Sequence, residues 1–172
     1  MVVVLAAAFA IGGAKEKTAR TDVPAHLETA TLRSGCFWSL QETLRQIPGV
    51  IKTTAGYTGG TVTNPTYELV ATRKTGHAEA VEVVFDPAKL SYEQLLADFL
   101  TSRKAASRSG IFYHSEEQRQ TAERVKEKIN QSGKGNSPVM TEITNATAFY
   151  PAEEYHQDYY RKNSAARSCS VF

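Results

Sequence analysis

The segment HAEAVEVVF, residues 77–85, constrains the fold more than any other part of this chain. Val81 and Val83 lie on one face of an extended strand, as the two-residue period of a strand requires. An Asp-Pro pair ends this strand, and Ser91 with Gln94 then forms a capping box that begins a helix. A strand followed closely by a capped helix predicts a fold that mixes both element types.

Similar patterns extend along the rest of the chain. They predict strands over residues 28–34, 50–57, 77–85, 110–114 and 139–149, and helices over residues 36–47, 92–100, 116–131 and 152–162. These elements repeat a strand–helix–strand order and include one hairpin-like pairing. We therefore expect an α+β fold: a two-layer α/β sandwich with a ferredoxin-like mixed sheet and helices packed on it.

The composition is typical of a globular protein whose positive and negative charges nearly balance. Of 172 residues, 41% are hydrophobic and 22% are charged, which suits one domain with a real core. A net charge of +2 argues against nucleic acid or an anionic membrane as the main partner. Because the sequence shows no internal repeat and no low-complexity linker, we expect residues 21–172 to form one domain that acts as a monomer.

The first residues differ in character from the rest. Residues 2–11 are apolar, but this run is too short to span a bilayer as a helix. With AFA at residues 8–10 as a small-residue cleavage site, residues 1–20 resemble a secretory signal that lacks its basic start. We treat them as a signal-like or disordered leader; a wrongly assigned translation start is the alternative. The compartment, cytoplasmic or exported, depends on whether they act as a signal.

The cysteines and histidines limit the cofactors. Cys36 and Cys169 are the two cysteines, so they can form one bridge, one catalytic pair or neither. The sequence contains no CxxC motif, and its four histidines lack the spacing of a zinc site. We therefore expect no metal site.

Cys36 lies at the expected start of a helix, after Gly35 and before two aromatic residues. A helix N-terminus favours a thiolate, and glycine allows a tight turn in front of it. The competing interpretation is an inert, packed cysteine. Phe37 and Trp38 point about 100° apart on a helix, so we expect one of them beside Cys36 rather than in the core. Ordinary packing of both is the alternative.

Glu79 and Tyr67 are the other candidates. The alanines on either side of Glu79 leave space for a ligand, and a carboxyl kept from water can stay protonated and act as an acid. The competing interpretation is an ordinary solvent-facing glutamate. Tyr57 and Tyr67 lie at a loop rich in glycine, where a tyrosine hydroxyl can donate to a substrate oxygen. Alternatively, Tyr67 simply packs at the start of the next element.

Together these segments resemble the A class of peptide methionine sulfoxide reductases. The matching stretches run in family order and are GCFW (35–38), GYTGG (56–60), NPTYELV (64–70), TGHAEAV (75–81), DPAKLSYEQLL (86–96), IFYHSEEQ (111–118) and FYPAEEYHQDYY (149–160). GCFW together with a downstream GHAE is highly specific for this family.

The resemblance implies an activity and a role for each matching residue. It implies an enzyme without a cofactor that reduces methionine S-sulfoxide, free or in oxidised proteins and peptides. Cys36 would be the nucleophile that becomes a sulfenic acid, and Glu79 would be the acid. Phe37 and Trp38 would hold the methyl group of the sulfoxide, and Tyr67 would bond its oxygen. Thioredoxin, or dithiothreitol in an assay, would then restore the reduced enzyme.

Two departures from the family pattern bear on activity. Family members usually carry a longer HDPT…NDVGTQYRS segment where this chain has LTSRKAASRSG (100–110), and Ser107 stands where the family has a second active-site tyrosine. Near the C-terminus, Cys169 lies close to the position of the family's resolving cysteine and is the candidate for that role. We predict an active reductase. The alternatives are a degenerate member that binds oxidised methionine with little turnover, and a generic thiol–disulfide oxidoreductase, which the missing CxxC disfavours.

Overall fold

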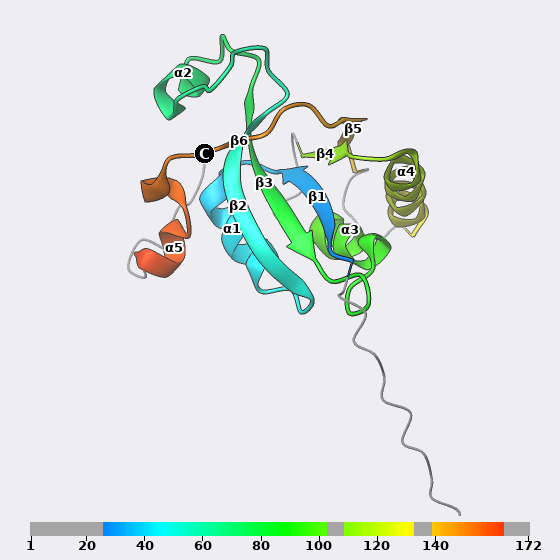
Figure 1. The fold of residues 1–172 in the computed structure, drawn as a ribbon. Helices are drawn as coiled ribbons and strands as arrows, with labels where there is room; N and C mark the ends of the chain where they lie inside the picture. The colour runs from blue at the N-terminus through cyan, green and yellow to red at the C-terminus, as the bar shows by residue number, and fades with distance from the viewer. Residues whose placement is uncertain (1–25, 103–108, 133–138, 164–172) are drawn as a thin grey trace, which may run out of the picture.

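The computed structural model describes residues 26–102, 109–132 and 139–163. Its elements alternate between strands and helices for most of the chain (Figure 1). They are β1 (Glu28–Arg33), α1 (Phe37–Arg45), β2 (Val50–Thr58), α2 (Tyr67–Ala71), β3 (Ala78–Phe85), α3 (Tyr92–Thr101), β4 (Gly110–Tyr113), α4 (Glu116–Gln131), β5 (Glu142–Asn145), β6 (Tyr150–Pro151), the 3-10 turn η1 (Glu154–His156) and α5 (Tyr159–Lys162). The expectations for residues 1–20, Ser107 and Cys169 lie outside the described residues.

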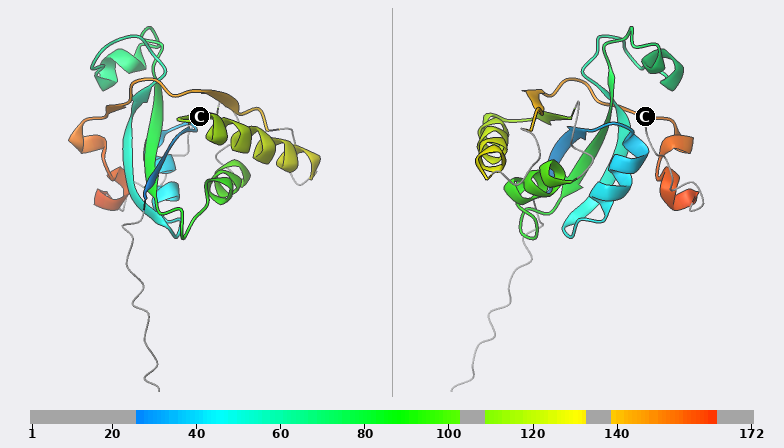
Figure 2. Two further views of the ribbon diagram at one scale, coloured as in Figure 1. Left: turned by 45° about the vertical axis from the view of Figure 1, so that its right-hand side comes forward. Right: turned by 180° about the vertical axis from the view of Figure 1, so that it is seen from behind.

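The strands form one mixed sheet in the order β5-β4-β1-β3-β2-β6. Its inner part, β4-β1-β3-β2, is antiparallel throughout and has the ferredoxin-like order. At the edges, β5 runs parallel to β4 and β6 runs antiparallel to β2. Helices α1 and α3 cover the same face of the sheet (Figure 2). The predicted α+β sandwich with a mixed sheet is therefore confirmed.

Helix α1 packs on the sheet through the apolar stripe that the sequence predicts. Phe37, Leu40 and Leu44 are each at most 2% exposed, and Ile47 packs against the same core just beyond the helix. Truncating a buried leucine such as Leu44 to alanine typically costs about 2–5 kcal/mol of folding free energy. This packing fixes α1 against β2 and β3.

The two predicted capping boxes begin their helices, but each makes only half of the expected pattern. Ser91 Oγ accepts from the Gln94 N–H at 3.1 Å, and Ser115 Oγ accepts from the Gln118 N–H at 3.2 Å. The side chain of Gln94 donates to Asp98 instead of turning back to the cap. The Gln118 side chain accepts from a backbone N–H one residue before its cap. The helix starts are nonetheless as predicted.

The predicted strand over residues 139–149 is wrong in extent. Its regular part is β5, four residues long, and the next strand, β6, pairs at the opposite edge of the sheet. The chain between them crosses the whole sheet (the orange segment in Figure 1), so it cannot continue as a single strand. Alternation in the sequence could not reveal this, because it carries no information about which edge a segment reaches.

The predicted amphipathic helix over residues 152–162 is also wrong. The segment holds only the turn η1 and the four-residue α5, separated by Gln157 in extended geometry and by Asp158 at φ +52°. The reason is a competing set of hydrogen bonds. The Gln157 amide donates to Ala55 O at 2.8 Å and accepts from Ala55 N–H at 2.9 Å. These bonds hold the segment against strand β2.

Across the described part of the chain, no helix has both the length and the apolar character needed to cross a membrane. Within the same residues, no group of three or more histidine, cysteine, aspartate or glutamate side chains could hold a metal ion.

Candidate active site

Cys36 is the N-cap residue of α1 and is half-buried. Its backbone is extended, and its carbonyl accepts the first helical hydrogen bond, from the Leu40 N–H at 3.2 Å. Gly35 in front of it has φ +56°, while a Cβ at that position would meet nothing within 4 Å. The turn therefore needs glycine for its backbone conformation rather than for space. The partial positive charge of the helix N-terminus lies at the thiol and favours its thiolate form.

Glu79 comes from β3 and reaches the same helix end. The backbone N–H of Phe37 donates to Glu79 Oε2 at 2.9 Å. Burial raises the pKa of the Glu79 carboxyl, and the bond from Phe37 only partly opposes that rise. The side chain is thus the inward, water-poor carboxyl that the sequence suggested, and the solvent-facing alternative is wrong for Glu79.

The two aromatic residues after Cys36 divide between core and site, as the helical period requires. Phe37 is 1% exposed and packs beside Tyr57, with ring centroids 5.9 Å apart. Trp38 is half-buried, and its indole stacks on Tyr159 with centroids 3.8 Å apart. Phe37 therefore lies in the core and Trp38 only partly so, while a position beside Cys36 for one of them stays a prediction.

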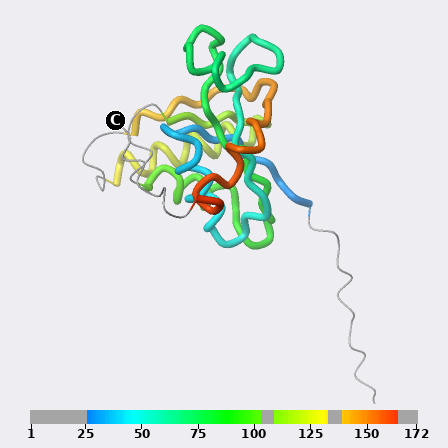
Figure 3. The backbone as a smooth tube through the Cα atoms, turned by 90° about the vertical axis from the view of Figure 1, so that its left-hand side faces the viewer, coloured from blue at the N-terminus to red at the C-terminus, as the bar shows by residue number. Residues whose placement is uncertain are grey.

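Tyr67 begins α2, in the segment between β2 and β3 that projects beyond the sheet (Figure 3). Burial raises the pKa of its hydroxyl, and the charges of Glu79 and Cys36 raise it further. The Tyr67 hydroxyl therefore lies within electrostatic range of both groups. The structure therefore brings Tyr67 to the site that Cys36, Glu79 and the aromatic pair share.

Tyr57 is different, because a partner within the protein holds its hydroxyl. The side chain is fully buried, and its hydroxyl donates to Glu153 Oε2 at 2.7 Å. Burial and this carboxylate raise the Tyr57 pKa well above its ordinary value. Of the two loop tyrosines that the sequence offered as donors, Tyr57 thus has its hydroxyl occupied by Glu153.

Three residues of the segment after β6 support the site and were missed from the sequence. Glu153 accepts from the Tyr67 N–H at 2.9 Å through its second oxygen. His156 accepts from the Trp38 indole N–H at 3.0 Å, and Gln157 bonds to Gln41 on α1. Their signal was the unusual density of glutamate, histidine and tyrosine in FYPAEEYHQDYY, which the helical interpretation assigned to an ordinary amphipathic surface.

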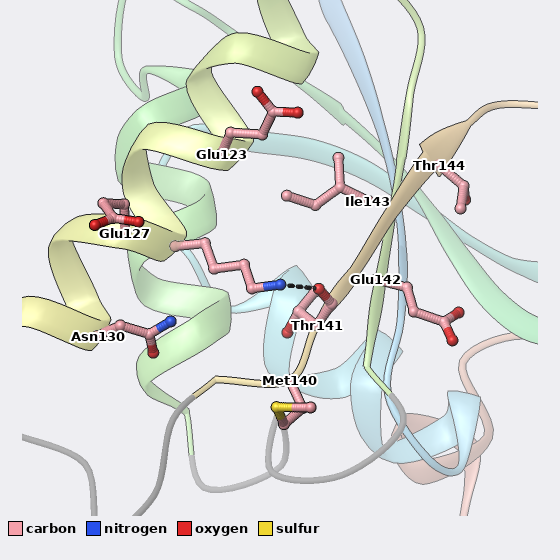
Figure 4. A pocket seen from close by; sticks show the side chains of 9 residues that line it. Glu123, Glu127, Asn130, Met140, Thr141, Glu142, Ile143 and Thr144 are labelled. Carbon is pink, nitrogen blue, oxygen red and sulfur yellow. Dashed lines mark hydrogen bonds between the residues drawn. The ribbon is translucent and has the colours of Figure 1, made fainter.

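A groove of about 650 Å³ lies elsewhere, between α4 and β5 (Figure 4). Its lining includes Met140, Glu123 and Thr141, and Lys126 Nζ donates to the Thr141 carbonyl at 2.7 Å. The site at the N-terminus of α1 lies on other elements and shares no residue with this groove.

The chain is similar to known proteins over most of its length. The family model described as peptide methionine sulfoxide reductase matches residues 28–172. A curated relative, peptide methionine sulfoxide reductase MsrA of Bacillus pumilus, is 47% identical over 148 residues, covering 79% of this chain and 83% of the relative.

Solved structures are also similar to this chain, at lower sequence identity. Mxr1 from Saccharomyces cerevisiae in reduced form has a TM-score of 0.74 and 27% identity, covering 86% of this chain and 91% of that one. Mxr1 in complex with Trx2 has a TM-score of 0.58 and 26% identity, covering 83% of this chain and 91% of that one.

Proposed function

This chain belongs to the peptide methionine sulfoxide reductase family, and from that membership we propose that Cys36 is its nucleophile and Glu79 its acid. The activity is that of a peptide-methionine (S)-S-oxide reductase, an oxidoreductase that returns methionine S-sulfoxide to methionine. A degenerate member without turnover is not favoured, because reductases of this name match most of the chain at 47% identity.

The proposed chemical step moves one oxygen and two electrons. The Cys36 thiolate attacks the sulfoxide sulfur while the Glu79 carboxyl gives its proton to the sulfoxide oxygen. The protonated oxygen then moves from the substrate sulfur to the Cys36 sulfur: the substrate sulfur–oxygen bond and the new bond between the two sulfurs break, and a sulfur–oxygen bond forms on Cys36. Methionine leaves as a thioether, and Cys36 is left as a sulfenic acid. The substrate sulfur is reduced and the cysteine sulfur is oxidised. Since all redox change stays on sulfur, we propose that no metal or bound cofactor takes part.

One observation carries this assignment: the 2.9 Å bond from the Phe37 N–H to the Glu79 carboxyl. Phe37 follows Cys36 directly, so this bond ties the carboxyl to the residue beside the thiol. Because burial raises its pKa, the carboxyl holds a proton at a higher pH than an exposed glutamate would. A nucleophile and a protonated acid next to each other are what the reaction needs.

The remaining residues would bind the sulfoxide. We propose that Phe37 and Trp38 form the apolar side of the site that holds the methyl group, with Trp38 at its surface and the buried ring of Phe37 behind it, and that the Tyr67 hydroxyl donates to the oxygen. Tyr67 is suited to this role because its raised pKa keeps the hydroxyl proton in place. Oxidised proteins and peptides are the substrate class that follows.

Recycling would use a second thiol and an external dithiol. We propose that the Cys169 thiol condenses with the sulfenic acid, releasing water and leaving a disulfide, and that thioredoxin reduces this disulfide. The complex of the relative Mxr1 with Trx2 supports such a partner.

A single-turnover assay tests the proposal. With dabsylated methionine S-sulfoxide and dithiothreitol, wild-type protein should form methionine and Cys36→Ser should form none, because a hydroxyl is a far weaker nucleophile at neutral pH and cannot cycle through a sulfenic acid. The R epimer serves as the matched substrate control and should remain unreduced. Methionine formation by Cys36→Ser would overturn the assignment.

A further inference from the structure

The imidazole of His156 lies at the centre of the aromatic cluster behind Cys36. It is 3% exposed, and its ring centroid is 5.1 Å from Phe37, 5.6 Å from Trp38 and 4.6 Å from Tyr67. One side chain therefore contacts all three residues proposed to bind the sulfoxide. It comes from the turn η1, far from them in sequence.

A single hydrogen bond sets the protonation of this ring. The indole N–H of Trp38 donates to His156 Nδ1 at 3.0 Å, and because an indole nitrogen can only donate, Nδ1 must carry no proton. The neutral ring then has its hydrogen on Nε2. Burial lowers the pKa of His156, more than the charges of Glu153 and Glu68 raise it, which agrees with a neutral imidazole.

His156 Nε2 is buried and lacks a hydrogen-bond partner among the residues that the structure describes; Glu153 Oε2 lies 3.9 Å away. Leaving a buried N–H unpaired is unfavourable. The tautomer that suits Trp38 is thus kept although it leaves the other nitrogen unsatisfied. The bond from the Trp38 indole to Nδ1 therefore determines the tautomer of His156, even though this tautomer leaves the Nε2 proton without an acceptor among the described residues.

Trp38 is held from two directions. Stacking on Tyr159, with the rings 10° from parallel, fixes the plane of the indole. Stacking alone lets the ring slide or turn within that plane, whereas the bond to His156 Nδ1 fixes where the N–H edge points. Because these two contacts come from the segment that follows β6, that segment determines how the indole faces Cys36.

We propose that His156 is a positioning residue that orients the Trp38 indole through Nδ1 and thereby sets the affinity for the sulfoxide side chain. The proposal rests on the role given to Trp38 under the proposed function. His156 itself neither touches the reacting atoms nor transfers a proton. Losing the bond should therefore weaken substrate binding and leave the chemical step close to its original rate.

Two substitutions with the same functional group separate positioning from packing. In His156→Asn, the amide oxygen can take the place of Nδ1 and accept from the indole. In His156→Gln, the amide lies one carbon further out, near the position of Nε2, and the acceptor facing Trp38 is lost. We expect His156→Gln to raise KM about tenfold with kcat changed less than about threefold, the size of one buried hydrogen bond. His156→Asn should keep KM within about threefold of wild type.

Fluorescence gives a second readout that does not depend on activity. Trp38 is the chain's single tryptophan, so emission anisotropy reports on that indole alone. We expect lower anisotropy in His156→Gln, because the indole gains freedom, and a wild-type value in His156→Asn. His114→Leu, which removes a histidine bonded to Thr31 on β1, is the matched control and should change neither KM nor anisotropy.

Equal KM values and equal anisotropies in the Asn and Gln variants would overturn the proposal, as would a collapse of kcat in both. If His156→Gln fails to fold, His156→Leu removes the acceptor while keeping an apolar side chain, and the same comparison applies. A wild-type protein without turnover would instead contradict the proposed function. The anisotropy difference would then still decide whether His156 holds Trp38.

Discussion

The backbone N–H of Phe37 and the carboxyl of Glu79 are joined by a 2.9 Å hydrogen bond. Two opposing influences meet there: burial disfavours the charged carboxylate, while the N–H favours it. Burial prevails, so the pKa of Glu79 is raised. The bond also holds the carboxyl at the start of α1, where the Cys36 thiol lies. The result is an acid that is kept in place and holds its proton to a higher pH than an exposed glutamate would.

Replacing Glu79 with glutamine should slow the reductive step about 10²-fold or more, the usual scale of general acid catalysis. Wild-type activity should fall as pH rises through the raised pKa of Glu79, because the acid form is lost. The glutamine variant should lack that part of the pH profile while its KM changes little. Rapid-quench measurement of methionine formation across pH 6–8 checks this. Equal rates for the two proteins would remove Glu79 from the acid role.

The same carboxyl should affect stability with a definite sign. Since its folded pKa is raised above the ordinary value of 4.5, the folded protein binds more protons than the unfolded chain between those two values. The contribution of Glu79 to the free energy of unfolding therefore declines as pH rises through that window. Urea titrations of wild type and Glu79→Gln should show the difference between them shrinking as pH falls through that window and staying constant below 4.5.

Glu153 should show the opposite dependence. Burial alone would raise its pKa, but the bonds from the Tyr67 N–H and the Tyr57 hydroxyl keep it below the ordinary value of 4.5. Its stabilising contribution is therefore complete above that value and lost as pH falls through the folded pKa. Glu153→Gln should cost about 1–3 kcal/mol at neutral pH, as for hydrogen bonds to a partly buried charged group, and should raise KM by loosening Tyr67.

The neighbouring Glu154 provides the matched control for Glu153. Its side chain is 88% exposed and pairs with Lys162 at 2.9 Å on the surface. Such exposed pairs contribute about 0–1 kcal/mol, so Glu154→Gln should unfold at nearly the wild-type denaturant concentration. Similar destabilisation by the two substitutions would show that the charge of this segment matters, rather than the anchoring of the tyrosines.

Much of this fold could be predicted because local patterns and global packing agree. The stripe of Phe37, Leu40 and Leu44 gave α1, and the alternation around Val81 gave β3, because each element buries one face of regular period. The segment after β5 obeys no such period. Its course is set by side-chain bonds such as those from Gln157 to the backbone of β2, and no local pattern encodes a partner so distant in the chain.

The residues of the candidate site also differ in how far the sequence alone could predict them. Cys36 and Glu79 stand out in sequence because their residue types and neighbours suggest chemistry at an element boundary. Glu153 and His156 do not, because they act by holding Tyr67 and Trp38 in place. A residue of that kind is recognisable only when its partners are seen beside it.

Cys169 should affect recycling and leave the first turnover intact. If it resolves the sulfenic acid, Cys169→Ser should still form one methionine per enzyme and then accumulate a sulfenic acid that dimedone traps. Turnover with thioredoxin should fall sharply, since no disulfide can form for the dithiol to attack. Mass spectrometry of the dimedone adduct on Cys36 is the measurement. Unchanged thioredoxin-driven turnover would make Cys169 a bystander.

The short connection between α3 and β4 should limit the rate. The family resemblance gives that connection a tyrosine where this chain has Ser107, so the sulfoxide oxygen would have one donor fewer. Losing one preorganised donor typically costs about 10²-fold in rate, or about 3 kcal/mol, and a shorter loop leaves the site wetter. Turnover should therefore be slow, with S-epimer preference kept because Cys36 and its aromatic neighbours set the handedness.

Grafting the longer family segment between Phe99 and Ile111 should raise kcat, because it returns both the donor and the cover over the site. Phe99 is 2% exposed and Ile111 is fully buried, so the graft would be anchored at both ends in the core. A glycine–serine insert of equal length is the control: it restores length without the tyrosine and should give little gain. A graft that folds yet leaves kcat unchanged would show that Glu79 and Tyr67 already supply all the activation of the oxygen that this site uses. An insert as effective as the graft would assign the gain to exclusion of water instead of to the added donor.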